Sequence, residues 1–374
     1  MPVRGAARLA RRPLANLNDA VGRSALVAQP APALPHHYTP AWWIPGPHLR
    51  TLWGKFFRRA APLPLRRERW DTPDGDFLDI VRLDAPAHVD QATAPRLLLL
   101  HGLEGTARSH YARGIFAEAR RRGWSADLLV FRSCGGELNR ARRFYHSGET
   151  SDLAMVVERL VADRPASPLL LAGYSLGGNV LLKYLGEGGR LLPPQLRAAA
   201  AVSVPFDLER GSRHIARGFS RVYERHFLRS LQRKARGKLA AYPDLVPADR
   251  LTTLRTLWDF DDAVTAPIHG FAGATDYYTR SSAIHYLAGI RTPTLLLSAR
   301  DDPFLPAAVL DEVRAIAEHN PALHVEFIDR GGHVGFISGR VPWRPFYYAE
   351  WRVAEHLAAQ LSRTERAQQA ADAR

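Results

Sequence analysis

The sequence contains little cysteine and no long apolar run. Its only cysteine among 374 residues is Cys134, so no intramolecular disulfide can form, and no cluster of cysteine and histidine with metal-ligand spacing accompanies it. A disulfide scaffold and a zinc scaffold are therefore excluded, and we expect an intracellular, cytoplasmic protein. No stretch approaches the ~18 consecutive apolar residues that a membrane-spanning helix needs. The content of 46% hydrophobic and 24% charged residues instead predicts a globular protein with a core of its own.

Lysine is also scarce, and arginine carries the positive charge. The 51 basic and 37 acidic residues give a formal net charge of +14, although the only lysines are Lys55, Lys183, Lys234 and Lys238. Such a charge can attract nucleic acid or anionic lipid, or it can reflect an arginine-rich genome. We therefore give it weight only where arginine clusters, and we expect no nucleic-acid partner. No dinucleotide fingerprint and no Walker loop occur, so we predict neither a cofactor nor a bound metal.

The chain divides into one predicted domain and two tails. Residues 1–35 are rich in arginine, alanine and proline and lack the apolar core of a secretory signal. We interpret them as a disordered basic tail, with an organelle transit peptide as the open alternative. Residues 36–362 form the predicted domain, and residues 363–374 are expected to be a flexible tail.

Apolar runs alternate with helical patterns along most of this domain. Asp74-Gly75 predicts a hairpin turn between two antiparallel strands at a sheet edge. The later strands are unbroken apolar runs such as L-L-L-L, which predicts a largely parallel sheet covered by helices on both faces. Strands are expected at 66–70, 77–83, 96–100, 126–131, 168–172, 198–204, 294–298 and 324–328, and helices near 111–122, 149–162 and 176–186.

The alternation stops over about residues 205–291, which predicts a mainly helical insertion that caps the sheet. Its first part repeats an apolar side chain every four residues, with arginines offset by two. At about 100° per residue, this offset places the two rows on opposite faces of one helix. We favour a packed cap helix with a solvated arginine face, and we leave open an anionic membrane surface as its partner. The apolar row is Ile215, Phe219, Tyr223, Phe227 and Leu231, and the basic row is Arg213, Arg217, Arg221, Arg225, Arg229 and Arg233.

A serine stands in a sharp turn between a predicted strand and a predicted helix. The turn reads Gly173-Tyr174-Ser175-Leu176-Gly177, which is the G-x-S-x-G nucleophile elbow in its required context. A serine at the apex of this strained turn projects its hydroxyl above the sheet, and the small residues beside it let strand and helix pack closely. A turn serine that merely caps the helix is the alternative. We predict that Ser175 is a catalytic nucleophile.

A nucleophilic serine needs a base and an orienting acid. In proteins with this elbow, the acid comes after the serine in the chain and the histidine comes last. The strand at 294–298 leads to Asp301-Asp302, and the last strand leads through two glycines to His333. We predict His333 as the base and favour Asp302 as the acid, with Asp301 as the alternative. The other aspartate would then make a turn or helix-capping hydrogen bond.

An oxyanion hole completes such a site. We predict that it consists of the backbone N–H groups of Leu103, in the loop H-G-L-E-G, and of Leu176, directly after the serine. His101 opens the same loop, but it precedes the serine in the chain, so we interpret it as structural. Cys134 has no evident histidine partner and is expected to be inert.

Seven segments together resemble the YheT-like branch of the α/β-hydrolase-domain proteins, over about residues 38–361. They are H-G-L-E-G, F-R-S-C-G-G-E-L-N-R, Y-H-S-G-E-T, G-Y-S-L-G-G-N, F-D-D-A-V-T-A-P, D-Y-Y and G-G-H-V-G-F. The resemblance implies an α/β-hydrolase fold with a helical cap. It also implies a serine hydrolase of the carboxylesterase or acylglycerol lipase type, with Ser175, Asp302 and His333 as the charge-relay residues.

The sequence therefore predicts an enzyme that cleaves carboxylic esters of the short-chain or acylglycerol type through an acyl-enzyme. A small-molecule or lipid ester is the expected substrate, with peripheral contact to an anionic membrane as a further expectation. A noncatalytic or moonlighting protein that binds an anionic membrane or nucleic acid through its arginine-rich helix is the alternative.

Overall fold

The computed structural model describes residues 37–59 and 62–372. The predicted basic tail, residues 1–35, lies outside the described residues. The predicted domain is built on a sheet of eight strands in the order β1-β2-β4-β3-β5-β6-β7-β8. The strands are β1 (Arg66–Asp71), β2 (Phe77–Leu83), β3 (Arg96–Leu100), β4 (Ser125–Val130), β5 (Leu169–Tyr174), β6 (Leu196–Val202), β7 (Thr294–Ala299) and β8 (Leu323–Ile328).

The sheet is parallel except at one edge, as the sequence predicts. Strand β1 pairs antiparallel with β2 across the Asp74-Gly75 turn, where Gly75 has φ +73°. Strand β2 also pairs antiparallel with β4, and the strands from β3 to β8 run parallel. All side chains of β3, β4 and β5 are buried, because helices cover both faces of these central strands.

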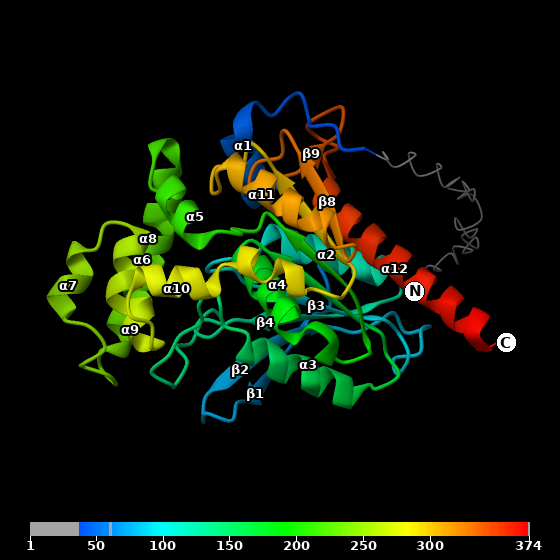
Figure 1. Ribbon diagram of the computed structural model, residues 1–374, viewed down its shortest axis with the longest axis horizontal. Coiled ribbons are helices and arrows are strands. Elements are labelled where there is room, and N and C mark those ends of the chain that lie inside the picture. The colour runs from blue at the N-terminus through cyan, green and yellow to red at the C-terminus, as the bar shows by residue number, and fades with distance from the viewer. Residues whose placement is uncertain (1–36, 60–61, 373–374) are drawn as a thin grey trace, which may run out of the picture. The chain divides into compact units, whose positions relative to one another are not determined.

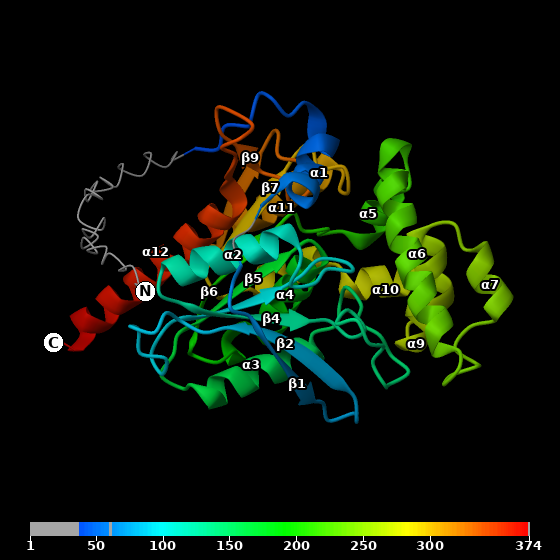
Figure 2. The same cartoon turned by 180° about the vertical axis from the view of Figure 1, so that it is seen from behind.

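Helices α2 and α12 pack side by side on one face of the sheet, whereas α3, α4 and α11 cover the other (Figures 1 and 2). A small antiparallel pair, β9 with β10, precedes α12. These elements are α2 (His110–Arg121), α3 (Ser151–Asp163), α4 (Leu176–Gly188), α11 (Ala307–Glu318), β9 (Ile337–Ser338), β10 (Phe346–Tyr347) and α12 (Tyr348–Asp372). Because α4 begins directly after β5, its first turn lies at the carboxyl edge of the sheet.

Two segments outside the sheet have a different structure from the one the sequence predicts. Residues 363–372, expected to be a flexible tail, continue α12 as a regular helix. Helix α1 (Gly46–Phe57) was not expected, because the aromatic and proline-rich segment around it has no clear helical period. Across residues 37–59 and 62–372, no helix has both the length and the apolar character needed to cross a bilayer.

The insertion between β6 and β7 is mainly helical, as predicted, and lies beyond one edge of the sheet (Figure 1). Its two-faced helix is not continuous, which corrects the prediction of one helix. Gly218, at φ +52°, interrupts the helical path, and the side chain of Ser220 donates a hydrogen bond to the carbonyl of Pro303 at 2.8 Å. The insertion contains α5 (Leu208–Ile215), a 3₁₀ turn (Gly218–Ser220), α6 (Arg221–Lys238), α7 (Ala248–Thr253), α8 (Leu257–Phe260), a π-helical turn (Asp261–Thr265), α9 (Ala266–Ile268) and α10 (Ala274–Ser281).

Candidate active site

Ser175 occupies the turn between β5 and α4 in a strained backbone conformation. Its φ of 53° and ψ of −122° lie in a region that residues with a side chain rarely adopt. The neighbouring glycines are needed for close packing. A Cβ atom on Gly177 would lie 2.5 Å from the carbonyl oxygen of His101, and one on Gly173 would lie 2.6 Å from the carbonyl oxygen of Gly177. The elbow therefore fixes a serine hydroxyl above the carboxyl edge of the sheet.

His333 and Asp302 meet Ser175 at this edge. The Nε2 atom of His333 lies 2.9 Å from the Oγ atom of Ser175, and its Nδ1 atom lies 2.8 Å from the Oδ2 atom of Asp302. An ionised carboxylate only accepts hydrogen bonds, so Nδ1 carries the ring proton and Nε2 is left as an acceptor for the serine hydroxyl. His333 and Asp302 are both buried. The arrangement can remove a proton from Ser175 and return it.

The adjacent Asp301 has a different task. Its Oδ1 atom accepts hydrogen bonds from the N–H groups of Gly331 and Gly332 at 2.7 and 2.8 Å, and its Oδ2 atom accepts one from Arg50 at 3.2 Å. The expectation that Asp301, as the aspartate not used as the acid, makes a turn or capping bond is corrected, because Asp302 itself accepts the turn hydrogen bond from the N–H of Phe304 at 2.8 Å. Asp301 holds the glycine loop that carries His333.

Further residues support His333, and no sequence pattern predicted them. The side-chain hydroxyl of Thr51, in α1, accepts a hydrogen bond from the N–H of His333 at 2.9 Å. Phe304 stacks on the imidazole with ring centroids 4.0 Å apart. The next N–H, of Val334, donates to the hydroxyl of Ser203 at 2.9 Å. These contacts come from three separate segments, so no local spacing could have predicted them.

The N–H groups predicted for the oxyanion hole are available. Leu103 follows β3, and Leu176 begins α4 next to Ser175. No atom of the described residues accepts a hydrogen bond from either N–H group. The flanking N–H groups are used instead by tyrosine hydroxyls, Gly102 with Tyr111 at 2.8 Å and Glu104 with Tyr145 at 3.0 Å. These bonds hold the loop while Leu103 N–H remains free for an anion.

A buried ion pair joins this loop to the cap, and sequence reasoning missed it. The Oε1 atom of Glu104 accepts from Lys234, in α6, at 2.6 Å and from Tyr145 at 2.8 Å. Its Oε2 atom accepts from Ser230, also in α6. Burial alone would raise the pKa of Glu104, but Lys234 and these hydroxyls lower it overall, so the carboxylate is ionised. Lys234 is one of only four lysines in the sequence, and this scarcity of lysine is the one feature that could have drawn attention to it.

His101 and Cys134 have structural surroundings, in agreement with their interpretation from sequence. The Nδ1 atom of His101 lies 2.7 Å from the carbonyl oxygen of Gly102, and Nε2 accepts from the N–H of Phe131 at 3.1 Å. Burial lowers the pKa of His101 to about 4, so the ring is neutral. Burial raises the pKa of Cys134 to about 11, which keeps the thiol protonated.

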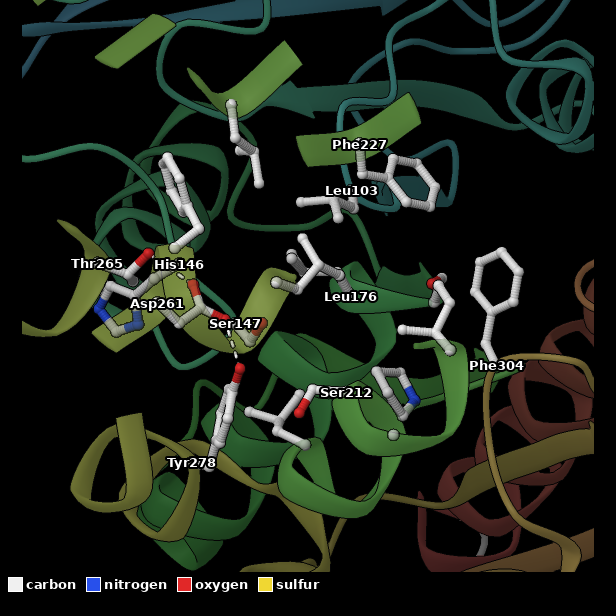
Figure 3. A pocket seen from close by; sticks show the side chains of 18 of the residues that line it. Leu103, His146, Ser147, Leu176, Ser212, Phe227, Asp261, Thr265, Tyr278 and Phe304 are labelled. Carbon is white, nitrogen blue, oxygen red and sulfur yellow. Dashed lines mark hydrogen bonds between the residues drawn. The ribbon is translucent and has the colours of Figure 1, made fainter. Parts of the chain in front are cut away.

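A cavity opens beside Ser175, between the sheet edge and the insertion (Figure 3). It holds about 1140 Å³ of space, including its open mouth. Ser175, Leu176 and His333 line one part of it, and apolar side chains of α5, α6 and α8 line much of the rest. In the part of the chain that the structure describes, no group of three or more histidine, cysteine or acidic side chains could hold a metal ion.

Comparisons with known proteins agree with this architecture. The chain matches the family described as alpha/beta hydrolase fold over residues 95–340. It is 41% identical over 316 residues to a protein of Escherichia coli (strain K12) provisionally named esterase YheT, a match that covers 84% of this chain and 91% of that protein. It is 30% identical over 315 residues to phospholipase ABHD3 of Mus musculus, covering 83% of this chain and 76% of that protein.

More distant matches extend the comparison. The chain is 31% identical over 277 residues to monoacylglycerol lipase of Saccharomyces cerevisiae, covering 71% of this chain and 60% of that protein. The solved structure of esterase Pf2001 from Pyrococcus furiosus has a TM-score of 0.53 and 16% identity, and covers 80% of this chain and 91% of that one. This structural likeness shows the fold alone.

Fold, site and matches together define an α/β hydrolase of the esterase type. The chain belongs to the YheT-like branch of the α/β-hydrolase family. Its relatives are named for esterase, phospholipase and lipase activities, so the class of reaction is hydrolysis of an ester.

Proposed function

We propose that this protein cleaves carboxylic esters through an acyl-enzyme formed on Ser175. The observation that carries the proposal is the continuous chain of hydrogen bonds from Ser175 to His333 at 2.9 Å and from His333 to Asp302 at 2.8 Å. His333 is the general base, Asp302 orients the imidazole, and the N–H groups of Leu103 and Leu176 form the oxyanion hole.

The reaction proceeds in two halves. In the first, His333 Nε2 accepts the hydroxyl proton as Ser175 Oγ bonds to the ester carbonyl carbon, and the carbonyl oxygen becomes an anion held by the two N–H groups. The bond to the alcohol oxygen then breaks, and Nε2 returns the proton to that oxygen. In the second half, water gives a proton to Nε2 and its oxygen bonds to the acyl carbon. The bond between that carbon and Ser175 Oγ then breaks, Nε2 returns the proton to Oγ, and the carboxylic acid is released.

The cavity supports an ester with an apolar chain as the substrate. Leu208, Leu231 and Leu257 line it beyond Ser175. Apolar walls favour a hydrocarbon chain over a polar one, because burial of each methylene group contributes about 0.8 kcal/mol. A relative named monoacylglycerol lipase and one named phospholipase support lipid esters within this class.

Hydrolysis of p-nitrophenyl esters tests this function. The purified protein should release p-nitrophenol from acetate, butyrate and longer acyl esters. Ser175→Ala should lower kcat/KM by ~10⁴ or more, because the covalent intermediate cannot form. The matched control is Ser298→Ala, which alters a buried serine of β7 away from the cavity lining. Equal activity of the folded Ser175→Ala variant and the wild type would refute the proposal.

We also propose that the protein contacts an anionic membrane surface while it acts, as a peripheral cytoplasmic protein. Exposed apolar side chains occur on α1, on the 3₁₀ turn before α6 and at the start of α6, and His48 of α1 packs on Phe219 of that turn with ring centroids 4.6 Å apart. Phe219, Val222 and Leu49 are 54%, 53% and 52% exposed. The neighbouring arginines of α6 are exposed and belong to none of the ion pairs among the described residues: Arg221, Arg225, Arg229 and Arg233. Exposed apolar groups beside unpaired arginines match the chemistry of an anionic lipid interface.

A further inference from the structure

Three sequence motifs contribute no residue to the hydrogen-bonded chain at Ser175, yet they meet in the same cavity. They are Y-H-S-G-E-T at 145–150, F-D-D-A-V-T-A-P at 260–267 and D-Y-Y at 276–278. Each contributes residues to the cavity lining. In Figure 3, His146, Asp261 and Thr265 gather at one end, away from Phe304, which stacks on His333 at the other. The cavity therefore has a catalytic end and a second, polar end.

The centre of the polar end is the carboxylate of Asp261, in the π-helical turn. Its Oδ1 atom accepts a hydrogen bond from the hydroxyl of Thr265 at 2.6 Å, and its Oδ2 atom accepts one from the hydroxyl of Tyr278 at 2.7 Å. Figure 3 shows the hydroxyl of Tyr278 directed toward this group. None of the ion pairs formed within residues 37–59 and 62–372 includes Asp261. Two hydroxyls thus fix the carboxylate without neutralising it.

The surrounding side chains do not supply a positive charge either. Burial lowers the pKa of His146 to about 3, and its Nδ1 atom accepts a hydrogen bond from the N–H of Gly148 at 3.1 Å. Burial also lowers the pKa of His269, whose Nδ1 atom lies 2.7 Å from the carbonyl oxygen of Thr265. Both histidines are therefore neutral near pH 7. The remaining titratable neighbours, Tyr277 and Tyr278, have pKa values raised by burial and are neutral as well.

Asp261 consequently has unused capacity to accept hydrogen bonds. Each carboxylate oxygen can accept two, and each accepts one from the protein. The side chain lines the cavity, and the residue as a whole is only partly buried. Burial raises its pKa to about 6, although the hydroxyls of Thr265 and Tyr278 lower it, because the charge is poorly solvated there. A ligand group that donates a hydrogen bond would restore the solvation that folding removes.

The cavity lining is mostly apolar, although the side chains of Ser203 and Ser212 also contribute to it. Leu176, Leu208 and Phe260 line the cavity along with other apolar side chains. A methylene chain suits such walls, whereas a chain with polar groups along its length would lose its hydration without replacement. A ligand that satisfies the whole cavity therefore has an ester group, an apolar middle and a donor at its far end.

We propose that Asp261, held by Thr265 and Tyr278, binds a hydrogen-bond-donating group, a hydroxyl or an ammonium, at the far end of the substrate's acyl chain. This inference rests on the proposed ester hydrolysis and specifies which esters the site prefers. A terminal methyl group in the same place would leave the carboxylate with neither water nor a partner. Sites built to bond a substrate donor reject the analogue that lacks it by large factors, so we expect at least a ~10-fold preference.

Matched p-nitrophenyl esters test the proposal. One set carries a terminal hydroxyl on the acyl chain, a second carries a terminal amine, and a third has a methyl group in that place. Measurements at about pH 8 keep Asp261 ionised, above its pKa of about 6. The wild type should favour one donor-bearing ester over the methyl ester by ~10-fold or more in kcat/KM. Preference for the hydroxyl identifies an alcohol donor, and preference for the amine identifies a cation.

Asp261→Asn should lower this preference about tenfold, because a neutral amide oxygen accepts a hydrogen bond less strongly than a carboxylate does. The matched control is Asp262→Asn, at the exposed neighbouring aspartate, which is absent from the cavity lining and accepts from the N–H of Ala274 at 2.9 Å. An unchanged preference in folded Asp261→Asn would overturn the proposal.

If Asp261→Asn does not fold, the wild-type protein alone still decides the test, through the ratio of kcat/KM for a donor-bearing ester to kcat/KM for the methyl ester. Ratios near one for both donors, with acetate hydrolysis that depends on Ser175, would overturn the inference and leave the proposed function standing. No hydrolysis of any ester would instead count against the proposed function.

Discussion

The polar side chains of the loops at the carboxyl edge of the sheet have more hydrogen-bond and ion-pair partners than those of the helical insertion. At the sheet edge, Asp302 is paired with both His333 and the backbone of Phe304, and Asp301 is paired with two glycine N–H groups and Arg50. In the insertion, Asp261 is bonded only by two hydroxyls, and the arginines of α6 extend into solvent. Satisfied groups hold a fixed geometry, whereas groups with spare bonding capacity can receive a ligand.

The difference indicates a division of tasks. In the proposed function, the sheet edge performs the proton transfers, and the insertion selects what approaches Ser175. The Glu104–Lys234 pair at 2.6 Å joins the two regions, since Glu104 follows Leu103, whose N–H we propose for the oxyanion hole, and Lys234 belongs to α6. The predictions below separate the contributions of the two regions.

The largest effect should follow a change at the sheet edge. Asp302→Asn should lower kcat/KM for a p-nitrophenyl ester by ~10³-fold or more, because an amide in that place favours the wrong imidazole tautomer. Asp301→Asn should lower it only about tenfold, because it loosens the loop of Gly331 and Gly332 without touching the imidazole. Steady-state kinetics of the two folded variants measure the contrast. The reverse ranking would assign the orienting role to Asp301.

A change to the solvent face of the insertion should weaken binding to membranes and leave ester hydrolysis unchanged. Neutralising Arg221, Arg225 and Arg229 to Gln should weaken cosedimentation with phosphatidylserine-containing vesicles about a hundredfold, since each basic residue adds to the attraction. Binding should also weaken with salt and be absent on neutral phosphatidylcholine vesicles. Hydrolysis of a soluble acetate ester should not change.

Three exposed arginines near the opposite edge of the sheet serve as the matched control for that experiment. The triple change of these residues to Gln should leave vesicle binding unaltered. Equal loss in the control, or sedimentation of the wild type with neither kind of vesicle, would contradict membrane contact by α6. The control residues are Arg190, Arg197 and Arg291.

Acid should destabilise both regions through neutral buried histidines. Burial lowers the pKa of His101, beside the sheet, from 6.5 to about 4, and that of His146, at the polar end of the cavity, to about 3. The unfolded chain binds these protons at a higher pH than the folded one, so stability is present above pH 6.5 and falls as the pH drops below it. The free energy of unfolding in urea should fall by roughly 2 kcal/mol per such histidine between about pH 6.5 and 5. A value independent of pH would contradict their neutral burial.

The smallest effect should come from the link between the two regions. Glu104→Gln removes the charge that pairs with Lys234 but keeps the size of the side chain. We expect kcat to fall about tenfold with KM nearly unchanged, because the loop that bears Leu103 N–H becomes less fixed around the transition state. The control is Glu137→Gln, an exposed residue that pairs with Arg69 at 2.8 Å. A rise in KM with kcat unchanged would place the role of Glu104 in substrate binding instead.

The sheet could be predicted closely because its signals are local. Unbroken apolar runs marked β3 and β5, and the strained turn with Gly173 and Gly177 marked Ser175. The positions of Asp302 and His333 after strands β7 and β8 placed them at the same edge. The strands needed only the periodicity of the chain and the geometry of parallel strands, whereas Ser175 and His333 also needed the G-x-S-x-G motif and its order of acid and histidine, and the choice of Asp302 over Asp301 had the family resemblance as support.

The remaining features depend on contacts between distant segments. Thr51 reaches His333 across 282 positions of the chain, and Lys234 reaches Glu104 across 130. The helix breaks at Gly218, where φ is +52° and Ser220 beyond it bonds to Pro303, and a helical period reveals neither contact nor break. The four-residue spacing of arginine was correctly read as an exposed face, but it also suggested a continuity that tertiary contacts override.

Covalent labelling at Ser175 tests the central claim most directly. A fluorophosphonate probe forms a stable bond only with a serine whose hydroxyl is activated by a base and whose developing anion is stabilised. The account predicts that the wild type gains one probe per chain, that peptide mass spectrometry assigns the adduct to Ser175, and that His333→Ala prevents it while Asp262→Asn does not. Labelling at another residue, or no labelling of the folded wild type, would contradict the account.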